Sequence, residues 1–390
     1  MPIINRLADF HAEITEWRQD FHANPEILYE VHRTAGIVEE KLKSFGVDEV
    51  VTGIGRTGVV GIIKGKSNKS GKVIGLRADM DALPIHEQTN KPYASTTEGK
   101  MHACGHDGHT AMLLGAAKYL AETRNFDGSV AVIFQPAEEG GAGGDAMVKD
   151  GLMEKFDIEE VYGMHNFPGI PVGEFAIRSG GIMAATDEFS IELEGVGGHA
   201  AMPHLAIDPI AIAAQMISGL QTLISRNVDP IKSAVLSVTI IKAGNASNVI
   251  ARTAIIKGTV RTLDEDVRDL MERRMKEFVT LSAQSFGAKA NVSYHRGYPV
   301  THNSPKQTAF AADVAAMVAG EDRVERNTNP TMGGEDFSYM LQARPGAYII
   351  VGQGDTAGLH EDTYDFNDEI IPIGCSYWVK LVETAMPANE

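Results

Sequence analysis

The sequence predicts an α/β protein in which a mostly parallel sheet with helices on both faces carries an inserted ferredoxin-like α+β domain. The chain has 390 residues, more than a single hydrophobic core usually holds. Up to about residue 166, buried-strand and helix patterns alternate, which is typical of a parallel sheet. From about residue 187 the order becomes β-α-β-β-α-β, which is the order of a ferredoxin-like sandwich.

The first part of the chain is expected to alternate in element type. The expected helices lie at 4–23, 33–46, 110–124 and near 144–153, and the expected strands at 57–65, 72–80, 129–135 and 159–166. Polar clusters follow several of these strands. Ligands bind at the carboxyl ends of strands in such sheets, so these clusters are the candidate site.

The pattern of the inserted part differs from that of the rest of the chain. It consists of strands at 187–196, 234–242, 252–262 and 288–296, with helices at 208–226 and 264–286. The remainder, with a helix at 306–319, a strand at 346–352 and a helix at 371–386, has too few strands to form a domain. We therefore expect one domain from 1–186 and 298–390, and a second from 187–297.

Composition excludes several kinds of partner. The formal net charge of −17 would repel phosphate backbones and anionic lipids, so neither nucleic acid nor a membrane is expected. The charged N-terminal stretch and the lack of an apolar run near twenty residues favour a cytoplasmic protein. Cys104 and Cys375 are too few for a disulfide framework.

Metal-ligating residue types follow separate predicted strands. Cys104 and His106 lie in "MHACGHDGHT", Glu138 and Glu139 follow the strand at 129–135, His165 ends the strand at 159–166, and His360 lies beyond the strand at 346–352. Thiolate, imidazole and carboxylate are the usual ligands of zinc and related metals. A chance polar cluster at a helix start is the alternative for the Cys104 segment.

The Glu138–Glu139 pair suggests two roles. Neighbouring residues of an extended chain point in opposite directions, so Glu139 can bind a metal while Glu138 serves as general base. Two solvated loop glutamates are the alternative. Asp81 can orient a ligating histidine through a hydrogen bond, or it can be a turn residue before Pro84.

Two other kinds of chemistry fit the sequence less well. A Cys104 nucleophile activated by His106 leaves the other ligand candidates unexplained. A phosphate-binding loop at "EEGGAGGD" lacks a lysine and begins with two acids, which would repel phosphate.

Seven ordered motifs across essentially the whole chain resemble the M20 metallopeptidase family. They are "MHACGHDGHT", "FQPAEEGGAGG", "GMHN", "GVGGHAAMPH", "NASNVIA", "MGGEDF" and "GLHEDT". The similarity is to its aminoacylase/carboxypeptidase branch, which contains hippurate hydrolases, indole-acetyl-amino-acid hydrolases and N-acetyl-diaminopimelate deacetylases.

The resemblance implies two divalent metal ions per subunit, zinc or manganese in the first place, with cobalt or nickel as alternatives. Cys104 would bridge them, and the other ligands would be His106, Glu139, His165 and His360. It implies Glu138 as the base and Asp81 as a carboxylate behind the ligands. His102 and His109 match no ligand position and are expected to be loop or helix-start residues.

The resemblance also implies roles for the inserted domain as a lid and dimerisation domain. His199 would reach a partner subunit's active site and stabilise the oxyanion, although a structural histidine is the alternative. Asn248 and Arg261 would bind the substrate carboxylate, with a salt-bridged surface arginine as the alternative for Arg261. Gly334 would allow close approach of the substrate. A homodimer, or a dimer of dimers, is expected to form through this domain.

The function that follows is hydrolysis of the amide bond of small N-acyl amino acids, with N-acetyl, benzoyl and indole-acetyl conjugates as candidate substrates. A dipeptidase or carboxypeptidase of the same family is an alternative. A relative that binds metal or ligand without catalysis is a second alternative.

Overall fold

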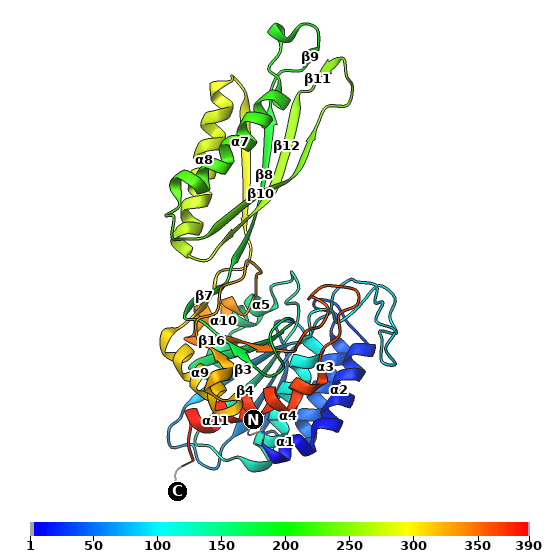
Figure 1. The fold of residues 1–390 in the computed structure, drawn as a ribbon, viewed down its shortest axis with the longest axis vertical. Coiled ribbons are helices and arrows are strands. Elements are labelled where there is room, and N and C mark those ends of the chain that lie inside the picture. Colours follow the sequence, from blue (N-terminus) through cyan, green and yellow to red (C-terminus); the bar gives the residue numbers. More distant parts are fainter. Residues whose placement is uncertain (1–3, 389–390) are drawn as a thin grey trace. The chain divides into compact units, whose positions relative to one another are not determined.

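The computed structural model describes residues 4–388 and divides into two compact units (Figure 1). Unit 1 contains the chain up to Gly180, His302–Asn329 and the chain from Asp336, and unit 2 contains Gly181–Thr301 and Pro330–Glu335. The chain enters unit 2 within β7 (Gly180–Met183) and again at Pro330, and it returns to unit 1 within β14 (Thr301–Asn303) and again at Asp336. The predicted insertion, 187–297, lies inside unit 2.

Unit 1 is built on a single eight-stranded sheet. In spatial order its strands are β1 (Glu49–Ile54), β2 (Gly58–Lys64), β4 (Ser129–Gln135), β3 (Val73–Asp79), β5 (Glu160–Phe167), β16 (Gly346–Gly352), β6 (Phe175–Ala176) and β15 (Val324–Glu325). The central strands β4, β3, β5 and β16 are parallel. This confirms the predicted largely parallel sheet.

The outer strands depart from the predicted pattern. β2 runs antiparallel to β4, and β1 is antiparallel to β2. The sequence analysis did not predict β1 because its residues are mostly exposed or half-buried and show no apolar run. The short strands β6 and β15 were missed for a similar reason, since two residues are too few to set a pattern.

Helices cover both faces of this sheet. They are α1 (Asn5–Asp9), α2 (His11–Ala23), α3 (His32–Ser44), α4 (His106–Thr123), α5 (Gly143–Lys149), α6 (Leu152–Lys155), α9 (Pro305–Ala319), α10 (Ser338–Ala343) and α11 (Ile371–Ala385). On β4, Val130, Val132 and Phe134 join the core formed with α4 and α11, while Ala131 and Ile133 are equally buried on the other face. A strand whose side chains are buried on both faces must be covered on both sides.

Two predicted helices are each divided in the structure. The helix expected over 4–23 breaks at Phe10 into α1 and α2. The helix expected near 144–153 ends at Asp150, and α6 begins after Gly151, whose φ of +84° is the left-handed conformation that glycine adopts readily.

Unit 2 has the predicted ferredoxin-like order. Its elements are β8 (Ala185–Glu194), α7 (Pro209–Asn227), β10 (Ala234–Ala243), β12 (Thr253–Thr262), α8 (Glu265–Ser285) and β13 (Lys289–Arg296), with the short pair β9 (Gly198–His199) and β11 (Val249–Ile250). The antiparallel sheet has the order β10-β12-β8-β13. In β8, Phe189, Ile191 and Leu193 are buried in the core with α7 and α8, and the intervening residues face the uncovered side.

Local sequence explains where the helices of unit 2 begin. The Asp264 carboxylate accepts hydrogen bonds from the backbone N–H groups of Asp266 and Val267 at the start of α8. Asp208 caps α7 in the same way, with Pro209 in the first helical position. Among the helices of residues 4–388, none has the length and apolar character needed to span a membrane.

Candidate metal centre and active site

The candidate ligands of unit 1 lie at the carboxyl ends of its central strands. Cys104 and His106 precede and begin α4, Glu138 and Glu139 follow β4, and His165 lies near the end of β5. His360 lies in the segment that follows β16, and its backbone N–H donates to the Ala103 carbonyl at 2.8 Å. That hydrogen bond joins the His360 segment to the loop that carries Cys104.

The ligand atoms form two groups that share Cys104. In each group the atoms lie within 4.8 Å of one another: the first contains Cys104, His106 and His165, and the second contains Cys104, Glu139 and His360. Cys104 Sγ lies 3.4 Å from His165 Nε2, and Glu139 Oε1 lies 3.5 Å from His360 Nε2. Ligands at about 2.0–2.3 Å from a zinc ion lie roughly 3–4 Å from each other, so both spacings suit a shared cation.

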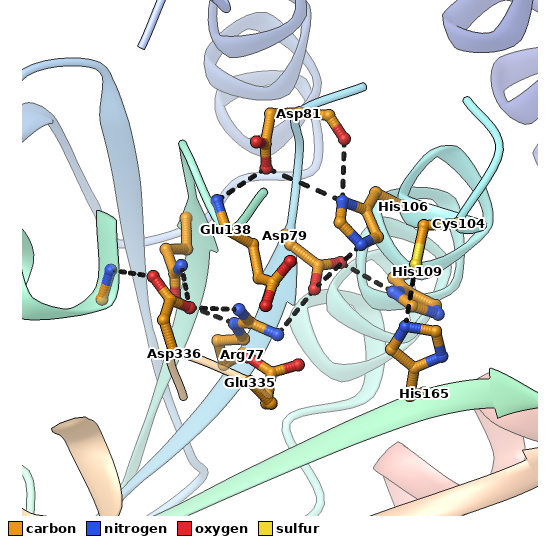
Figure 2. A network of polar contacts seen from close by, with 12 residues as sticks. Arg77, Asp79, Asp81, Cys104, His106, His109, Glu138, His165, Glu335 and Asp336 are labelled. Carbon is orange, nitrogen blue, oxygen red and sulfur yellow. Dashed lines mark hydrogen bonds and ion pairs between the residues drawn. The ribbon is translucent and has the colours of Figure 1, made fainter. Parts of the chain in front are cut away.

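Hydrogen bonds orient the two buried histidines with Nε2 toward the centre of the cluster. His106 Nδ1 donates to the Asp81 backbone carbonyl at 2.7 Å (Figure 2). His165 Nδ1 donates to the Asn166 carbonyl at 2.5 Å. In the neutral form of each imidazole, Nε2 therefore carries a lone pair. His106 Nε2 is buried and finds no hydrogen-bond partner among residues 4–388, and the same holds for Glu139 Oε1. Two buried acceptors that face each other at 3.9 Å without a donor fit a divalent cation.

Asp81 acts on the cluster through both its backbone and its side chain. Its carboxylate is predicted from the sequence to orient a ligating histidine, but the carbonyl makes that hydrogen bond and the carboxylate lies 3.6 Å from the same His106 nitrogen. The carboxylate instead accepts the backbone N–H groups of Glu138 and Glu139, at 2.8 and 3.1 Å. Asp81 thus fixes the backbone from which both glutamates project.

Glu138 lies beside the ligand groups. Its carboxylate is within 4.8 Å of ligand atoms of His106 and Glu139, and the residue is 8 % exposed. The extended chain predicts that the two glutamates point in opposite directions, whereas both carboxylates lie within 4.8 Å of the same histidine, His106. The turn that achieves this includes Ala137 in a left-handed conformation, with a φ of +55°.

Burial and neighbouring groups shift the pKa values of the candidate ligands. Burial opposes the charge of His106, but Asp79 and Cys104 raise its pKa well above the ordinary value. Burial raises the pKa of the Cys104 thiol to about 12, with the Glu139 carboxylate adding to the effect. Burial also lowers the pKa of His165 well below its ordinary value, with further contributions from His109 and His106. A cation bound here would have to displace the thiol proton, so its affinity would increase with pH.

A buried network lies behind the ligands on the side of β3. Arg77 Nη1 donates to Asp79 at 2.6 Å, Arg77 Nη2 donates to Asp336 at 3.0 Å, and the Asp336 carboxylate also accepts the Gly144 N–H at 2.8 Å (Figure 2). Burial opposes the charge of Asp79, but Arg77 and two histidines hold its pKa well below the usual range. The sequence analysis gave neither Arg77 nor Asp336 a role, although an arginine inside a buried strand is a detectable signal.

A second charged network holds the first turn of α4. Asp107 accepts from His22 Nδ1 at 2.8 Å and lies 3.5 Å from Arg18 Nη1. Burial would lower the pKa of His22, but its hydrogen bonds to Asp107 and Glu87 raise it to about 9. His22 is therefore charged at neutral pH. Arg18 also pairs with Asp368, so the network joins α2 to the segment that carries His360.

His102 and His109, which were expected to bind no metal, differ in their surroundings. Burial lowers the pKa of His102 to about 4, and its ring nitrogens have no hydrogen-bond partner within the part of the chain that the structure describes. His109 bridges two residues, with Nδ1 at 2.6 Å from Asp79 Oδ1 and Nε2 at 2.7 Å from Asn166 Oδ1.

His199 and Asn248 of unit 2 line one pocket of about 790 Å³, together with glycines of the loops around them. His199 lies in β9, where it pairs with Val249 of β11. The backbone N–H of Ala201 donates to His199 Nδ1 at 3.0 Å. This leaves Nε2 of the exposed imidazole as the protonated nitrogen, which can donate a hydrogen bond to a ligand.

Arg261 and Gly334 lie elsewhere in unit 2. Arg261 lines a different pocket, of about 360 Å³, with Glu188, Ser293 and His295 among its neighbours. Gly334 packs against Thr186, because a Cβ at this position would lie 2.3 Å from the Thr186 Cγ2. The structure therefore does not group Arg261 with His199 and Asn248 in one pocket.

Comparison with known proteins agrees with this geometry. Residues 75–384 match the model of peptidase family M20/M25/M40. The chain is 44 % identical over 381 residues to a hippurate hydrolase of Campylobacter jejuni, covering 98 % of each chain. It is 41 % identical over 386 residues to an N-acetyl-L-cysteine deacetylase of Bacillus subtilis, covering 98 % of this chain and 91 % of the relative.

A solved structure extends the likeness to the fold. A dinuclear metal-binding peptidase of the M20 family from Bacillus subtilis superposes with a TM-score of 0.86 at 33 % identity, covering 97 % of this chain and 99 % of that one. A parallel-stranded unit with a ferredoxin-like insert and a buried Cys/His/carboxylate cluster belongs to the metallohydrolase class. The chain is a member of peptidase family M20/M25/M40, and it is an amidohydrolase of that family.

The loop that carries Cys104 and His106 requires glycine at position 105. Gly105 has a φ of +92°, and a Cβ there would lie 2.3 Å from the Asn166 Oδ1 and 2.7 Å from the Tyr364 hydroxyl oxygen. Gly71 has a φ of +66°, but its Cβ would meet no atom of the described chain within 4 Å. Substitution at the two positions therefore separates the backbone cost from the clash.

We predict that Gly105→Ala lowers the free energy of unfolding more than Gly71→Ala does. The left-handed conformation costs about 1–2 kcal/mol in either variant, and the clash adds about 1–3 kcal/mol in the first. Urea unfolding of the two variants and the native chain measures the difference. Equal losses would show that the neighbours of Gly105 adjust freely.

Proposed function

We propose that the protein hydrolyses the amide bond of N-acyl amino acids at a centre of two divalent cations. The observation that carries this proposal is the pair of ligand groups sharing Cys104, with Glu138 beside them. The names of the relatives, a hippurate hydrolase and an acetylcysteine deacetylase, support an acylated amino acid as substrate.

In this proposal Cys104, His106 and His165 hold one cation, and Cys104, Glu139 and His360 hold the other. When bound, such ions make water a nucleophile at neutral pH and polarise the substrate carbonyl. The metal could be zinc or manganese, or cobalt or nickel. The protein contributes the fixed Nε2 directions of the two buried histidines and the burial that excludes bulk water.

Glu138 is the proposed general base. Its carboxylate accepts a proton as the water oxygen attacks the amide carbonyl, and it returns the proton to the nitrogen as the C–N bond breaks. The products are a carboxylic acid and a free amino acid. The hydrogen bond from the Glu138 N–H to Asp81 supports this role, because it holds the backbone of the base in place.

The proposed contributions of unit 2 are to bind the substrate and its transition state. His199 donates from Nε2 to the carbonyl oxygen as it becomes negative, and Asn248, in the same pocket, binds the amino acid carboxylate. Arg261 and Gly334 are proposed as further substrate contacts. Arg261 lines a pocket separate from that of His199 and Asn248.

We propose that the protein dimerises through unit 2 and that unit 2 also acts as a lid. β10 is an edge strand of its sheet, and Ile240 and Ile241 on that strand are 42 % and 52 % exposed. An edge strand with exposed apolar residues favours pairing with a second copy of the chain.

The role of Glu138 is tested by Glu138→Gln, which keeps the shape of the side chain and removes its basicity. We expect kcat to fall by at least about 100-fold while both metal ions stay bound, measured by amine release and elemental analysis. Glu98→Gln, at an exposed site, is the matched control and should keep native activity. Near-native turnover of Glu138→Gln would exclude Glu138 as the base.

Metal dependence is tested by exhaustive chelation. We expect loss of activity on N-acetyl, benzoyl and indole-acetyl amino acids, and recovery when Zn²⁺, Mn²⁺, Co²⁺ or Ni²⁺ is added. Chelated protein that remains active would contradict the dinuclear centre. Unblocked dipeptides in the same screen distinguish a dipeptidase or carboxypeptidase, and a metal-binding protein without catalysis would release no amine from any of them.

Action of His199 across a dimer is tested by complementation. His199→Ala and Glu138→Gln chains should each be inactive, and a mixed dimer should recover up to about half of the activity of a native dimer, because one of its two composite sites would hold both functional residues. Amine release after co-refolding measures this. Without recovery, His199 acts within its own subunit or has no part in the reaction.

A further inference from the structure

A buried hydrogen-bonded chain runs directly behind the candidate ligands. It connects Asp79 at the end of β3, His109 of α4, Asn166 of β5, Tyr364 and Gln353. All five residues are at most 2 % exposed. Figure 2 shows the start of this chain, where His109 lies between Asp79 and the ligands Cys104 and His165.

Asn166 is the central residue of this chain. Its Oδ1 lies 2.7 Å from His109 Nε2, and its Nδ2 donates to Gln353 Oε1 at 2.7 Å and to the Tyr364 hydroxyl at 2.6 Å. The backbone of Asn166 also takes part, because its carbonyl accepts from His165 Nδ1. One residue therefore contacts groups from β5, α4 and the two segments that follow β16.

Each of these contacts leads to a segment with a proposed ligand. His165 precedes Asn166 in β5, and Tyr364 lies four residues after His360. Gly105, between Cys104 and His106, lies so close to the Asn166 amide that a Cβ would come within 2.3 Å of it. The Asn166 side chain thus meets all the ligand-bearing segments except the one that follows β4.

We propose that Asn166 is a positioning residue for the metal centre: it holds Cys104, His106, His165 and His360 in the arrangement that binds two cations. This inference rests on the proposed function, because it concerns the same cations. Asn166 itself is no ligand in this assignment, since its amide oxygen and nitrogen are engaged by His109, Gln353 and Tyr364.

Like Asn166, His109 is no metal ligand in this assignment. Its ring lies within ligand distance of Asp79 and His106, so geometry alone would allow a third metal group. Each ring nitrogen, however, lies within hydrogen-bond distance of an oxygen, on Asp79 and on Asn166. The imidazole therefore links the carboxylate of β3 to the amide of β5.

The physical reason is the cost of unsatisfied buried groups. Removing the Asn166 amide would take one short hydrogen bond each from Gln353 Oε1, the Tyr364 hydroxyl and His109 Nε2 inside the core. Gln353 and Tyr364 would keep their mutual hydrogen bond at 3.2 Å and would move to find further partners. The segments that carry His360 and Cys104 would move with them. Replacing partners behind metal ligands typically reduces metal affinity about 10- to 100-fold.

The test compares Asn166→Ala with Asn303→Ala. Asn303 is a matched control because it is also fully buried, donates to the carbonyls of Arg178 and Tyr348, and accepts the Tyr348 N–H. Tyr364→Phe is a milder second variant that removes a single hydroxyl and retains the ring in the core.

Metal binding is measured on chelated full-length protein. Isothermal titration with Zn²⁺ gives the stoichiometry and Kd, and the thiolate-to-metal absorption band with Co²⁺ reports on Cys104. Urea unfolding of the metal-free proteins gives the loss of stability in each variant.

We expect Asn166→Ala to weaken at least one Zn²⁺ site by about 10- to 100-fold and to alter the Co²⁺ band. Tyr364→Phe should weaken the same site by a smaller factor. Asn303→Ala should lose comparable stability and keep two sites of native affinity. If Asn166→Ala does not fold, Tyr364→Phe and Asn303→Ala decide the question.

Two native-affinity sites in Asn166→Ala, or in Tyr364→Phe where the first variant does not fold, would overturn the inference. The inference would also be overturned if Asn303→Ala weakened the Zn²⁺ sites by the same factor as Asn166→Ala. A native chain that binds no Zn²⁺ would instead overturn the proposed function, so the two failures are distinguishable.

Discussion

The site depends on the parallel pairing of β4, β3, β5 and β16. Parallel strands end at the same edge of a sheet, so residues separated by more than 250 positions, such as Cys104 and His360, come together there. Helices bury both faces of these strands, so the sheet is covered by protein on both sides. The side chains at the strand ends are therefore held in a buried environment in which an unpaired charge is costly.

Much of the surrounding structure compensates for that cost. Arg77 forms ion pairs with Asp79 and Asp336 on the side of β3, and Asp107 is paired with His22 and Arg18 on the side of α2. Truncating one partner of such a pair leaves an uncompensated buried charge. The same groups join segments distant in sequence, so the neutralisation of charge and the alignment of ligands are achieved by the same contacts.

The two units differ in how they present polar residues. In unit 1 most of the candidate groups are buried, and backbone carbonyls orient His106 and His165, whereas the His360 side chain is 55 % exposed. In unit 2, His199 is exposed on the short strand β9, and Asn248 lies in the loop before β11. A rigid buried cluster suits metal ligation, because ligand directions must be fixed before the ion arrives. Exposed groups on a short strand and a loop suit contacts made only when a substrate is present.

The sequence by itself determined the order of the elements and the kinds of ligand, because apolar periodicity and the chemistry of Cys, His and Glu are local properties of the chain. It indicated where Cys104, Glu139 and His360 stand relative to strands. Only the tertiary structure decided which candidate ligand atoms lie within reach of one another, that the Asp81 carbonyl orients His106, and that Asn166 connects the segments. Each of these depends on partners tens to hundreds of residues apart, and the direction of a hydrogen bond between such partners is set by packing that no local pattern contains.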